Sequence, residues 1–371
     1  MSEFEEATAG DEQRASRVPA VTRAVDVLTD IALHGPSSLA ELTRRLGIPK
    51  SSLLGICQTL VEDGLLSNAP DGRYRLGLGL AELADAQRSQ PTRPARLGLT
   101  VQNLTNPFFT VEADAIAAAA RELGAEVILK DAGQDVASQC EHLTAFTAAS
   151  VDAIILDAVH SAEVAGPITK AQDAGIPVVA VNVGAARADA TVTTDNVQAG
   201  QALARHVGRL LGGTGTVGIV DGLPVTAVRD RIVGFLSALR EFPGVTVSAR
   251  VTGDHSADGG EHAAKEMLDQ RVPDAIFAIN DPTALGVLKA LHARKLSVPV
   301  VSVDGSAAAV ESIVRGEPLV ATAAQDPREL GRLAVVAAAD LHAGRPLRPR
   351  TRLLPTSLIT ADNATTYEPW G

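Results

Sequence analysis

Two phenylalanines stand side by side at a position suited to hold a small ligand. Aromatic residues make up only 3% of the chain, yet Phe108 and Phe109 are adjacent and follow Asn106 and a proline. An apolar run, residues 97–101, precedes them, and a helix-like run, residues 115–123, comes after. In open α/β sheets, ligands bind at the carboxyl ends of strands, where rings stack on a ligand's apolar face and an amide hydrogen-bonds its edge. The same rings are explained equally well as core anchors of a packed helix, so both interpretations stay open.

A second set of polar and basic residues, between residues 44 and 75, is suited to contact phosphates. Lys50 and two serines open an apolar helical run, and the N–H and hydroxyl groups at a helix N-terminus bind phosphates. Each charge taken singly is better explained as a solvated surface residue, whereas the whole set on one structural plan favours DNA contact. The candidates are Arg44, Arg45, Lys50, Ser51, Ser52, Gln58, Arg73 and Arg75.

Helical spacing and turn signals describe the first elements of the N-terminal region. Val21, Val25 and Leu28 recur at helical spacing, which predicts a first helix. Ser38, followed three residues later by Glu41, is a capping-box pattern and predicts the start of a second short helix. A small N-terminal helical module is therefore expected.

A third helix and a hairpin complete this module. The helix begins near Lys50, and its inner face contains Leu53 and Leu60. An Asp71-Gly72 turn lies between two short strand-like runs, as in a β-hairpin. Three helices followed by a hairpin form the winged helix-turn-helix plan, in which the third helix enters the major groove of DNA.

From residue 97 onward, short β-branched runs alternate with helical runs. Such alternation predicts βαβ units and parallel sheets covered on both faces by helices. The number of runs favours two lobes over one sheet. The strand candidates are residues 97–101, 126–129, 153–156, 178–181, 216–220, 245–251, 275–278, 300–303 and 319–323.

Length and charge agree with a modular protein. A chain of 371 residues predicts two or three domains. The net charge of −11 divides into −5 over residues 1–12, +3 over residues 13–96 and −9 over the remainder. A mildly basic module before a large acidic one is compatible with DNA contact at one end. Two cysteines, no secretory signal and no long apolar run predict a cytoplasmic protein without a membrane span.

Residues 18–87 resemble the IclR-type winged-helix domain. The resemblance is carried by residues 22–28, 38–42, 46–52, 60–66 and 71–77. It implies a transcriptional regulator that binds operator DNA as a homodimer or higher homo-oligomer. The chain departs from the family at Leu54 and Gly55, where members usually carry polar or basic groups. Ser51, Ser52 and Gln58 then remain as candidates to read base edges.

Residues 97–363 resemble the ribose-binding-protein type of periplasmic sugar receptor, which also forms the effector domain of LacI-type repressors. The matching stretches are residues 106–109, 175–179, 194–196, 227–235, 278–281, 303–305 and 323–327. The resemblance implies two Rossmann-like lobes with a monosaccharide-like ligand between them. We expect the three crossovers between the lobes near Thr194, Gln325 and Pro355.

The resemblance also implies a set of ligand-binding residues. Asp281 is expected to cap a helix instead of touching ligand. Asp157, Asn182 and His255 occupy pocket positions where ribose-type receptors carry other residues, and Val183 stands in place of an arginine, so the expected ligand is a sugar, polyol or cyclitol and not ribose in particular. The implied ligand-binding residues are Asn106, Phe108, Phe109, Asp157, Asn182, Arg229, His255, Asn280, Asp304 and Gln325.

The chain is therefore interpreted as a small α+β winged helix-turn-helix domain followed by a two-lobed α/β domain, in a ligand-responsive transcriptional regulator. No metal-ligand spacing, cofactor motif or nucleophile–base pair is found, so we expect no metal, no cofactor and no enzymatic activity. The alternative is a sugar sensor or scaffold with a degenerate head that binds no operator. The expected divisions are a disordered tail (1–17), the DNA-binding domain (18–87), a linker (88–96), lobe 1 (about 97–194 and 326–355), lobe 2 (about 195–325 and 356–363) and a C-terminal tail (364–371).

Overall fold

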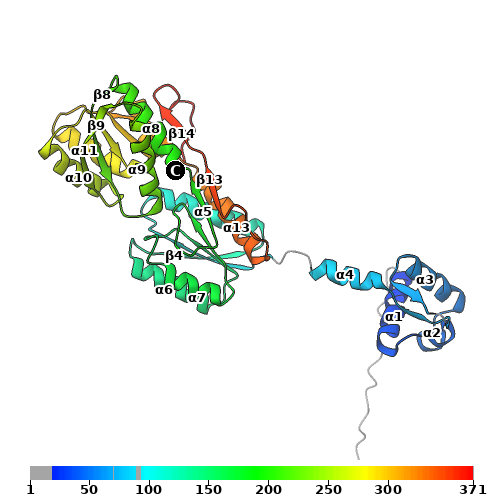
Figure 1. The fold of residues 1–371 in the computed structure, drawn as a ribbon. Coiled ribbons are helices and arrows are strands. Elements are labelled where there is room, and N and C mark those ends of the chain that lie inside the picture. The colour runs from blue at the N-terminus through cyan, green and yellow to red at the C-terminus, as the bar shows by residue number, and fades with distance from the viewer. Residues whose placement is uncertain (1–18, 70, 89–92, 371) are drawn as a thin grey trace, which may run out of the picture. The chain divides into compact units, whose positions relative to one another are not determined.

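The computed structural model describes residues 19–69, 71–88 and 93–370. It divides into two compact units, Met1–Pro91 and Thr92–Gly371, each of which is described by itself (Figure 1). The expected tail of residues 1–17 and residues 89–92 of the expected linker lie outside the described residues. Within the described ranges, no helix is long and apolar enough to cross a membrane.

The first unit has three helices, a two-stranded antiparallel hairpin and a fourth helix. The Ser38 side chain accepts a hydrogen bond from the Glu41 N–H, and the Glu41 carboxylate accepts one from the Ser38 N–H, so the predicted capping box is confirmed. Gly47 ends the second helix with a left-handed φ of 66°. The elements are α1 (Pro19–His34), α2 (Leu39–Leu46), α3 (Lys50–Glu62), β1 (Leu66–Asn68), β2 (Tyr74–Leu76) and α4 (Leu78–Arg88).

The core of this unit is built from one face of each of the first three helices. Val27 and Ile31, one helical turn apart on α1, are buried, whereas Val21 and Val25 are 60% and 55% exposed. The predicted first helix is confirmed, and it carries apolar residues on two faces, of which only the face with Val27 and Ile31 packs into the core. The core residues are Val27, Ile31, Leu42, Ile48, Leu53, Cys57, Leu60 and Leu66.

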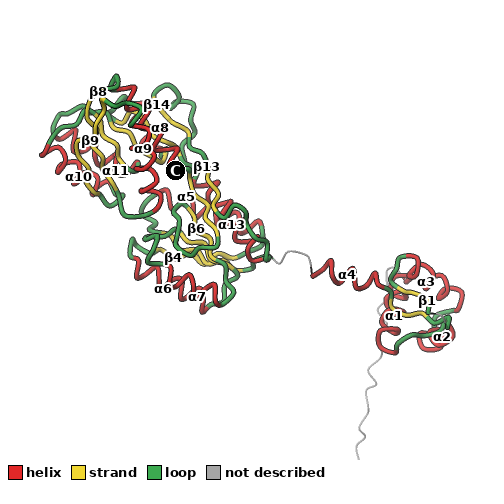
Figure 2. The backbone as a smooth tube through the Cα atoms, in the orientation of Figure 1, coloured by secondary structure: helices red, strands yellow, loops and turns green. Residues whose placement is uncertain are grey.

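The second unit contains two six-stranded sheets, and each forms the centre of one lobe (Figure 2). All neighbouring strands are parallel except β12 and β14. Lobe 1 has the order β13 (Thr351–Leu354), β7 (Ala190–Thr194), β6 (Val178–Val181), β5 (Ala153–Leu156), β3 (Arg96–Val101) and β4 (Glu126–Asp131). Lobe 2 has the order β14 (Ser357–Thr360), β12 (Leu319–Ala324), β11 (Val300–Asp304), β10 (Ala275–Ala278), β8 (Thr214–Asp221) and β9 (Gly244–Thr252).

Helices cover both faces of each sheet, as the βαβ pattern predicts. In lobe 1, α5 (Pro107–Glu122) pairs with α13 (Pro327–His342) on one face, and α6 (Val136–Ala148) pairs with α7 (Ala165–Asp173) on the other. In lobe 2 one face is covered by α8 (Asn196–Leu210) and α9 (Thr226–Leu239). The opposite face is covered by α10 (Ala257–Gln270), α11 (Asp281–Ala293) and α12 (Ala307–Val314).

Three short strands that the sequence did not predict surround the crossovers between the lobes. They are β7, β13 and β14, with five, four and four residues, and β13 and β14 lie at sheet edges. The chain passes between the lobes after β7, after β12 and between β13 and β14. The edge strands β13 and β14 are half-solvated and short, and β7 alternates buried and half-buried residues, so the three strands lack the apolar runs that mark fully buried strands.

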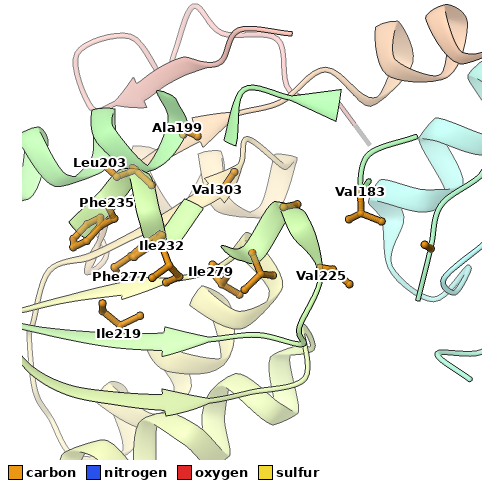
Figure 3. Packing of buried hydrophobic residues seen from close by; sticks show 14 of the residues in the cluster. Val183, Ala199, Leu203, Ile219, Val225, Ile232, Phe235, Phe277, Ile279 and Val303 are labelled. Atoms are coloured by element: carbon orange, nitrogen blue, oxygen red, sulfur yellow. The ribbon is translucent and has the colours of Figure 1, made fainter. Parts of the chain in front are cut away.

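One apolar cluster continues from lobe 1 into lobe 2 (Figure 3). In lobe 2 the rings of Phe235 and Phe277 are stacked, with centroids 4.5 Å apart. Val183 follows the last central strand of lobe 1 and Val225 precedes α9 of lobe 2, and both belong to the cluster. The lobes therefore meet through packed side chains as well as through the three crossovers.

The segment after β14 is packed, and the expectation of a C-terminal tail over residues 364–371 is wrong for the described part. Ala364 is 3% exposed and Trp370 is 4% exposed. Trp370 forms an isolated parallel bridge with Ser306 of lobe 2. A tail would leave this large apolar ring in water, whereas burial removes it from solvent.

Candidate functional site

A cleft between the two lobes is lined by fourteen side chains. Four of these side chains, those of Gln102, Asn182, Asp304 and Gln325, end or directly follow a strand, which is where open α/β sheets bind ligands. The lining residues are Gln102, Asn106, Phe108, Phe109, Asn182 and Val183 from lobe 1, with Val225, Ala227, Val228, Arg231, His255, Asn280, Asp304 and Gln325 from the rest of the cleft.

The lobe 1 wall carries the two rings. Asn106 caps α5: its side-chain oxygen accepts a hydrogen bond of 3.0 Å from the Phe108 N–H. The next residue, Pro107, occupies the first turn, where a missing N–H costs nothing. Phe108 and Phe109 lie edge to face, with centroids 5.7 Å apart. Both rings belong to the lobe 1 core, which confirms their role as core anchors, and both also line the cleft, so their contact with a ligand stays a prediction.

The lobe 2 wall is a polar network around Asp304. Gln325 Nε2 donates to Asp304 Oδ1 at 2.7 Å, and Arg231 Nη1 lies 4.0 Å from the same oxygen. Arg231 is held by two further acceptors, Asn196 Oδ1 at 2.8 Å and the Ile279 carbonyl at 2.9 Å. All of these groups are nearly inaccessible to solvent, so their positions are fixed before any ligand arrives.

Burial shapes the charges in this network. Burial, and then the neighbouring Asp281 carboxylate, raise the pKa of Asp304 to about 7, while Arg231 opposes the shift. Burial also lowers the pKa of Arg231, against the attraction of Asp304 and Asp281. The wall therefore offers one fixed cation beside a carboxyl group that changes charge near neutrality.

His255 and Asn280 complete the lobe 2 wall. Burial lowers the pKa of His255 to about 4, so its imidazole is neutral at pH 7. Its Nε2 accepts a hydrogen bond of 2.9 Å from the Leu223 N–H, which assigns the ring proton to Nδ1. Asn280 caps α11 by accepting from the Thr283 N–H. The prediction that Asp281 is the cap was wrong: Asp281 is buried and accepts hydrogen bonds from neighbouring hydroxyl groups.

Arg229 does not lie where the sequence predicted. Its side chain is 68% exposed and pairs with Asp230 at 2.9 Å on the outer surface of α9. Arg231 lines the cleft instead, on the same helix face as Ala227 and Val228. Each helical residue rotates by about 100°, so residues two apart point to nearly opposite sides. The family motif located the helix correctly, and the structure moves the cleft arginine to Arg231.

Asp157 lies behind the cleft wall instead of in it. It is completely buried and accepts hydrogen bonds from Gln102 Nε2 at 2.7 Å and Asn182 Nδ2 at 3.0 Å, both of which line the cleft. Burial raises the pKa of Asp157 to about 7, although those hydrogen bonds oppose the shift. Burial, and then Asp157, raise the pKa of Glu112 well above its usual value. The raised pKa favours the protonated form of Glu112, and we assign a positioning role to Asp157.

The other predicted residues of the effector domain line the cleft, and the structure adds several. Gln102 directly follows the predicted strand of residues 97–101, and that position was the available signal for it. Arg231 lies within residues 227–235, one of the stretches that carry the family resemblance. The sequence therefore located its helix but not the face of that helix that lines the cleft. Val225, Ala227 and Val228 are small apolar residues around the start of α9 and carry no chemical signal in the sequence.

In the first unit, the outward face of α3 carries the predicted DNA-binding residues of that helix. Lys50, Ser51, Ser52 and Gln58 are exposed. Pro49 precedes the helix and makes no side-chain cap, so backbone N–H groups of the first turn are left for other acceptors. Such a helix end suits a phosphate oxygen. Leu54, 39% exposed, lies among these residues and offers no hydrogen bond to a base edge.

The four arginines of this unit that were predicted to contact DNA differ in their surroundings. Arg44 is exposed at the end of α2. Arg45 instead holds the buried Asp30, through Nε at 2.9 Å and Nη2 at 2.6 Å, and lowers the pKa of that carboxyl group. Arg73 donates to the Pro36 carbonyl and lies 3.4 Å from Glu41, while Arg75 Nε donates to Ser67 Oγ. Arg45 therefore has a structural role that the sequence did not reveal.

The fold and the cleft define a two-lobed ligand-binding domain of the periplasmic-binding-protein class, and the first unit defines a winged helix-turn-helix. Comparison with family models agrees: residues 97–346 match the periplasmic binding protein domain, and residues 20–70 match the IclR helix-turn-helix domain. The chain belongs to the periplasmic-binding-protein-domain family and carries an IclR-type helix-turn-helix ahead of that domain. The resemblances found in the sequence are thereby confirmed.

Known solute-binding proteins and a known transcriptional regulator are similar to the chain. The ribose import binding protein RbsB of Bacillus subtilis (strain 168) is 31% identical over 71% of this chain and 87% of the relative. The HTH-type transcriptional regulator DegA of the same strain is 25% identical over 72% of this chain and 80% of the relative. A solute binding protein from Bacillus halodurans C-125, solved with bound myo-inositol, has a TM-score of 0.69 and 29% identity, covering 74% of this chain and 97% of that structure.

Proposed function

We propose that the chain is a transcriptional regulator that binds operator DNA through its winged helix-turn-helix and senses a monosaccharide, polyol or cyclitol in the inter-lobe cleft. The observation that carries the proposal is the pairing of Arg231 and Asp304, nearly buried, in one cleft with two phenylalanine rings. No purely apolar ligand would satisfy this pair, because buried charged groups require polar partners.

The cleft chemistry suits a ring or chain of hydroxyl groups. A guanidinium group donates in pairs and a carboxylate accepts in pairs, which matches neighbouring hydroxyl groups on a carbon skeleton. Asn280 and Gln102 add amide groups, and the rings of Phe108 and Phe109 offer apolar surface to the C–H face of the ligand. The names of the relatives, with ribose and myo-inositol among their ligands, support the same class.

The proposed DNA contacts come from the exposed end of α3 and the basic residues around it. Lys50, Ser51 and Ser52 contact phosphates, and Gln58 reads a base edge from the next turns of the helix. Operators are commonly read by dimers whose two heads occupy half-sites at a fixed spacing. We therefore assign a homodimer as the DNA-binding form, in which ligand-dependent lobe closure changes operator affinity.

A thermal-shift screen of the full chain tests the ligand class. Pentoses, hexoses, polyols and inositols are each added at millimolar concentration, and positive compounds are measured by isothermal titration calorimetry. Because a ligand that binds only the folded state raises its stability, at least one compound should raise the melting temperature of the second unit. If all four classes leave that temperature unchanged, the sugar-sensing part of the proposal is rejected.

Fluorescence anisotropy with DNA from upstream of the chain's own gene tests the regulator part. Lys50→Ala is compared with Lys170→Ala, an exposed lysine of the second unit. Lys50→Ala should weaken binding and reduce the salt slope by about one, since one phosphate contact is lost. If the unaltered chain gives no competitor-resistant binding, the alternative of a sensor with a degenerate head is favoured, in agreement with the exposed Leu54.

A further inference from the structure

The segment after β14 forms a further, non-covalent link between the lobes, in addition to the three crossovers and the apolar cluster that the lobes share. It begins at the end of β14 in lobe 2 and reaches Trp370, whose ring belongs to the core of lobe 1. The three crossovers join the lobes through backbone, which permits rotation about the bonds of each connection. A packed side chain that touches both lobes restricts that rotation further.

On the lobe 2 side, the segment is bonded to the backbone around Asp304. Trp370 Nε1 donates to the Asp304 carbonyl at 2.9 Å, and Tyr367 Oη donates to the Gly305 carbonyl at 3.2 Å. The fit is close, because a Cβ on Gly305 would lie 2.8 Å from the Tyr367 hydroxyl oxygen. Gly305 also has a φ of 78°, so glycine is required there on two counts.

On the lobe 1 side, the indole packs against the aromatic pair of the cleft. Its centroid lies 5.3 Å from that of Phe108, edge to face, and Phe108 meets Phe109 in the same way. The three rings form a chain whose first member is outside the cleft lining and whose last two members are part of it. A shift of Trp370 is therefore passed to the ring surface that the proposed ligand would contact.

The backbone of Asp304 explains why the contact with Trp370 matters for ligand binding. Asp304 has a φ of 142°, which is strained for a residue with a side chain, and its carbonyl accepts from both Trp370 Nε1 and the Gln325 N–H. Strained backbone persists only where surrounding contacts over-determine it. The carboxylate of the same residue faces the cleft beside Arg231, so the indole N–H helps to fix the direction of a ligand-binding group.

We infer that Trp370 is a positioning residue for the ligand: it holds Phe108 of lobe 1 and Asp304 of lobe 2 in their binding geometry at once. The inference rests on the proposed sugar-sensing function and adds to it a residue outside the cleft that controls affinity. Trp370 is the single tryptophan of the chain, so its fluorescence reports directly on this link. A sugar that binds between the lobes changes the emission of the unaltered protein.

The test compares three variants of the full chain by calorimetry with a sugar identified in the screen. Trp370→Ala removes both contacts and should weaken binding by at least about tenfold, as expected for loss of a buried hydrogen bond together with ring packing. Trp370→Phe keeps a ring against Phe108 but cannot donate to Asp304, and should lose about three- to tenfold. Phe146→Leu is the matched control, because this fully buried ring on α6 neither lines the cleft nor belongs to the cluster that holds Trp370. It should lower thermal stability while leaving the dissociation constant unchanged.

Two outcomes of the calorimetry overturn the inference. The first is an unchanged dissociation constant in Trp370→Phe and, where it folds, Trp370→Ala. The second is an equal loss of affinity in Phe146→Leu, which would mean that any core defect has the same effect. If the unaltered chain binds no sugar, the proposed function fails. Hydrogen exchange of the ligand-free protein then tests separately whether Trp370 links the two lobes. Exchange in Trp370→Phe should then quicken in both residues 104–112 and residues 301–308, and unchanged exchange in either region rejects the link.

Discussion

Identical substitutions at two positions of α9, Arg231→Met and Arg229→Met, test the cleft most directly. The side chains differ in environment: 7% of Arg231 is exposed, against 68% of Arg229. Methionine keeps an unbranched chain but removes the charge and all hydrogen-bond donors. In Arg231→Met, Asn196 and the Ile279 carbonyl lose their buried donor, which costs about 1–3 kcal/mol for each acceptor.

The net effect on folding is smaller than the sum of those losses. Methionine carries no buried charge, which recovers part of the desolvation cost of arginine. Asp304, whose pKa is already raised to about 7, takes up a proton when its cation is removed. We expect the free energy of unfolding to fall by about 2–3 kcal/mol, within the range of buried polar losses. Arg229→Met should change it by no more than about 0.5 kcal/mol, as is usual for surface substitutions.

Ligand binding separates the two variants more clearly. A hydrogen bond from a charged donor contributes about 1.5–3 kcal/mol, so Arg231→Met should bind the sugar about 10- to 150-fold more weakly. Calorimetry at 25 °C measures this directly, and circular dichroism establishes that the variant is folded. If Arg231→Met binds within a factor of about three of the unaltered chain, ~0.6 kcal/mol, the assignment of Arg231 to the ligand is wrong. If only Arg229→Met loses affinity for the sugar, Arg229 is the ligand-binding arginine, as the sequence predicted.

Two further predictions concern buried charges outside the cleft lining. The pKa of Asp157 is raised to about 7, and that of Glu112 is also raised. The contribution of this pair to the free energy of unfolding is therefore complete below about pH 4 and is lost as the pH rises through about 7. Glu112→Gln should therefore flatten the fall in melting temperature between pH 5 and 8, and an unaltered slope would show that Glu112 is not protonated. Arg45→Ala should lower the melting temperature of the first unit because Asp30 loses its partner, whereas Arg44→Ala should not. Equal melting temperatures for these two variants would refute the structural role of Arg45.

Much of the fold was predictable because its elements leave strong local signals. The capping box at Ser38 and the turn glycine at position 47 mark the helices of the first unit, and both are present in the structure. The central strands are buried on both faces and read as continuous apolar runs, which is why they were found. The interior strand β7 alternates buried and half-buried residues, and the edge strands β13 and β14 carry threonine, arginine and serine on exposed positions, so no such run identifies the three strands.

The candidate site was predictable by segment but not by side chain. The motif around residues 227–235 identified α9, yet the choice between Arg229 and Arg231 depends on which helix face packs against lobe 2. That choice is made by tertiary contacts, here with Asn196 and the Ile279 carbonyl. Trp370 illustrates the same limit, because its partners, Phe108 and Asp304, lie 262 and 66 residues away in the sequence. Local patterns carry no information about contacts of that range.

The polar groups of the cleft and the crossovers between the lobes belong to one circuit, made of hydrogen bonds and of the 4.0 Å ion pair between Arg231 and Asp304. Gln325 lies at the second crossover, donates to Asp304 and accepts from Thr194 Oγ1 at 2.6 Å, and Thr194 ends the strand before the first crossover. Asn196 closes the circuit by donating to the Thr194 carbonyl and accepting from Arg231. Any rotation of the lobes about these crossovers must therefore re-aim the Asp304 and Arg231 side chains. A ligand that binds both groups favours one lobe arrangement over others, which is the differential contact that a ligand-driven change of state requires.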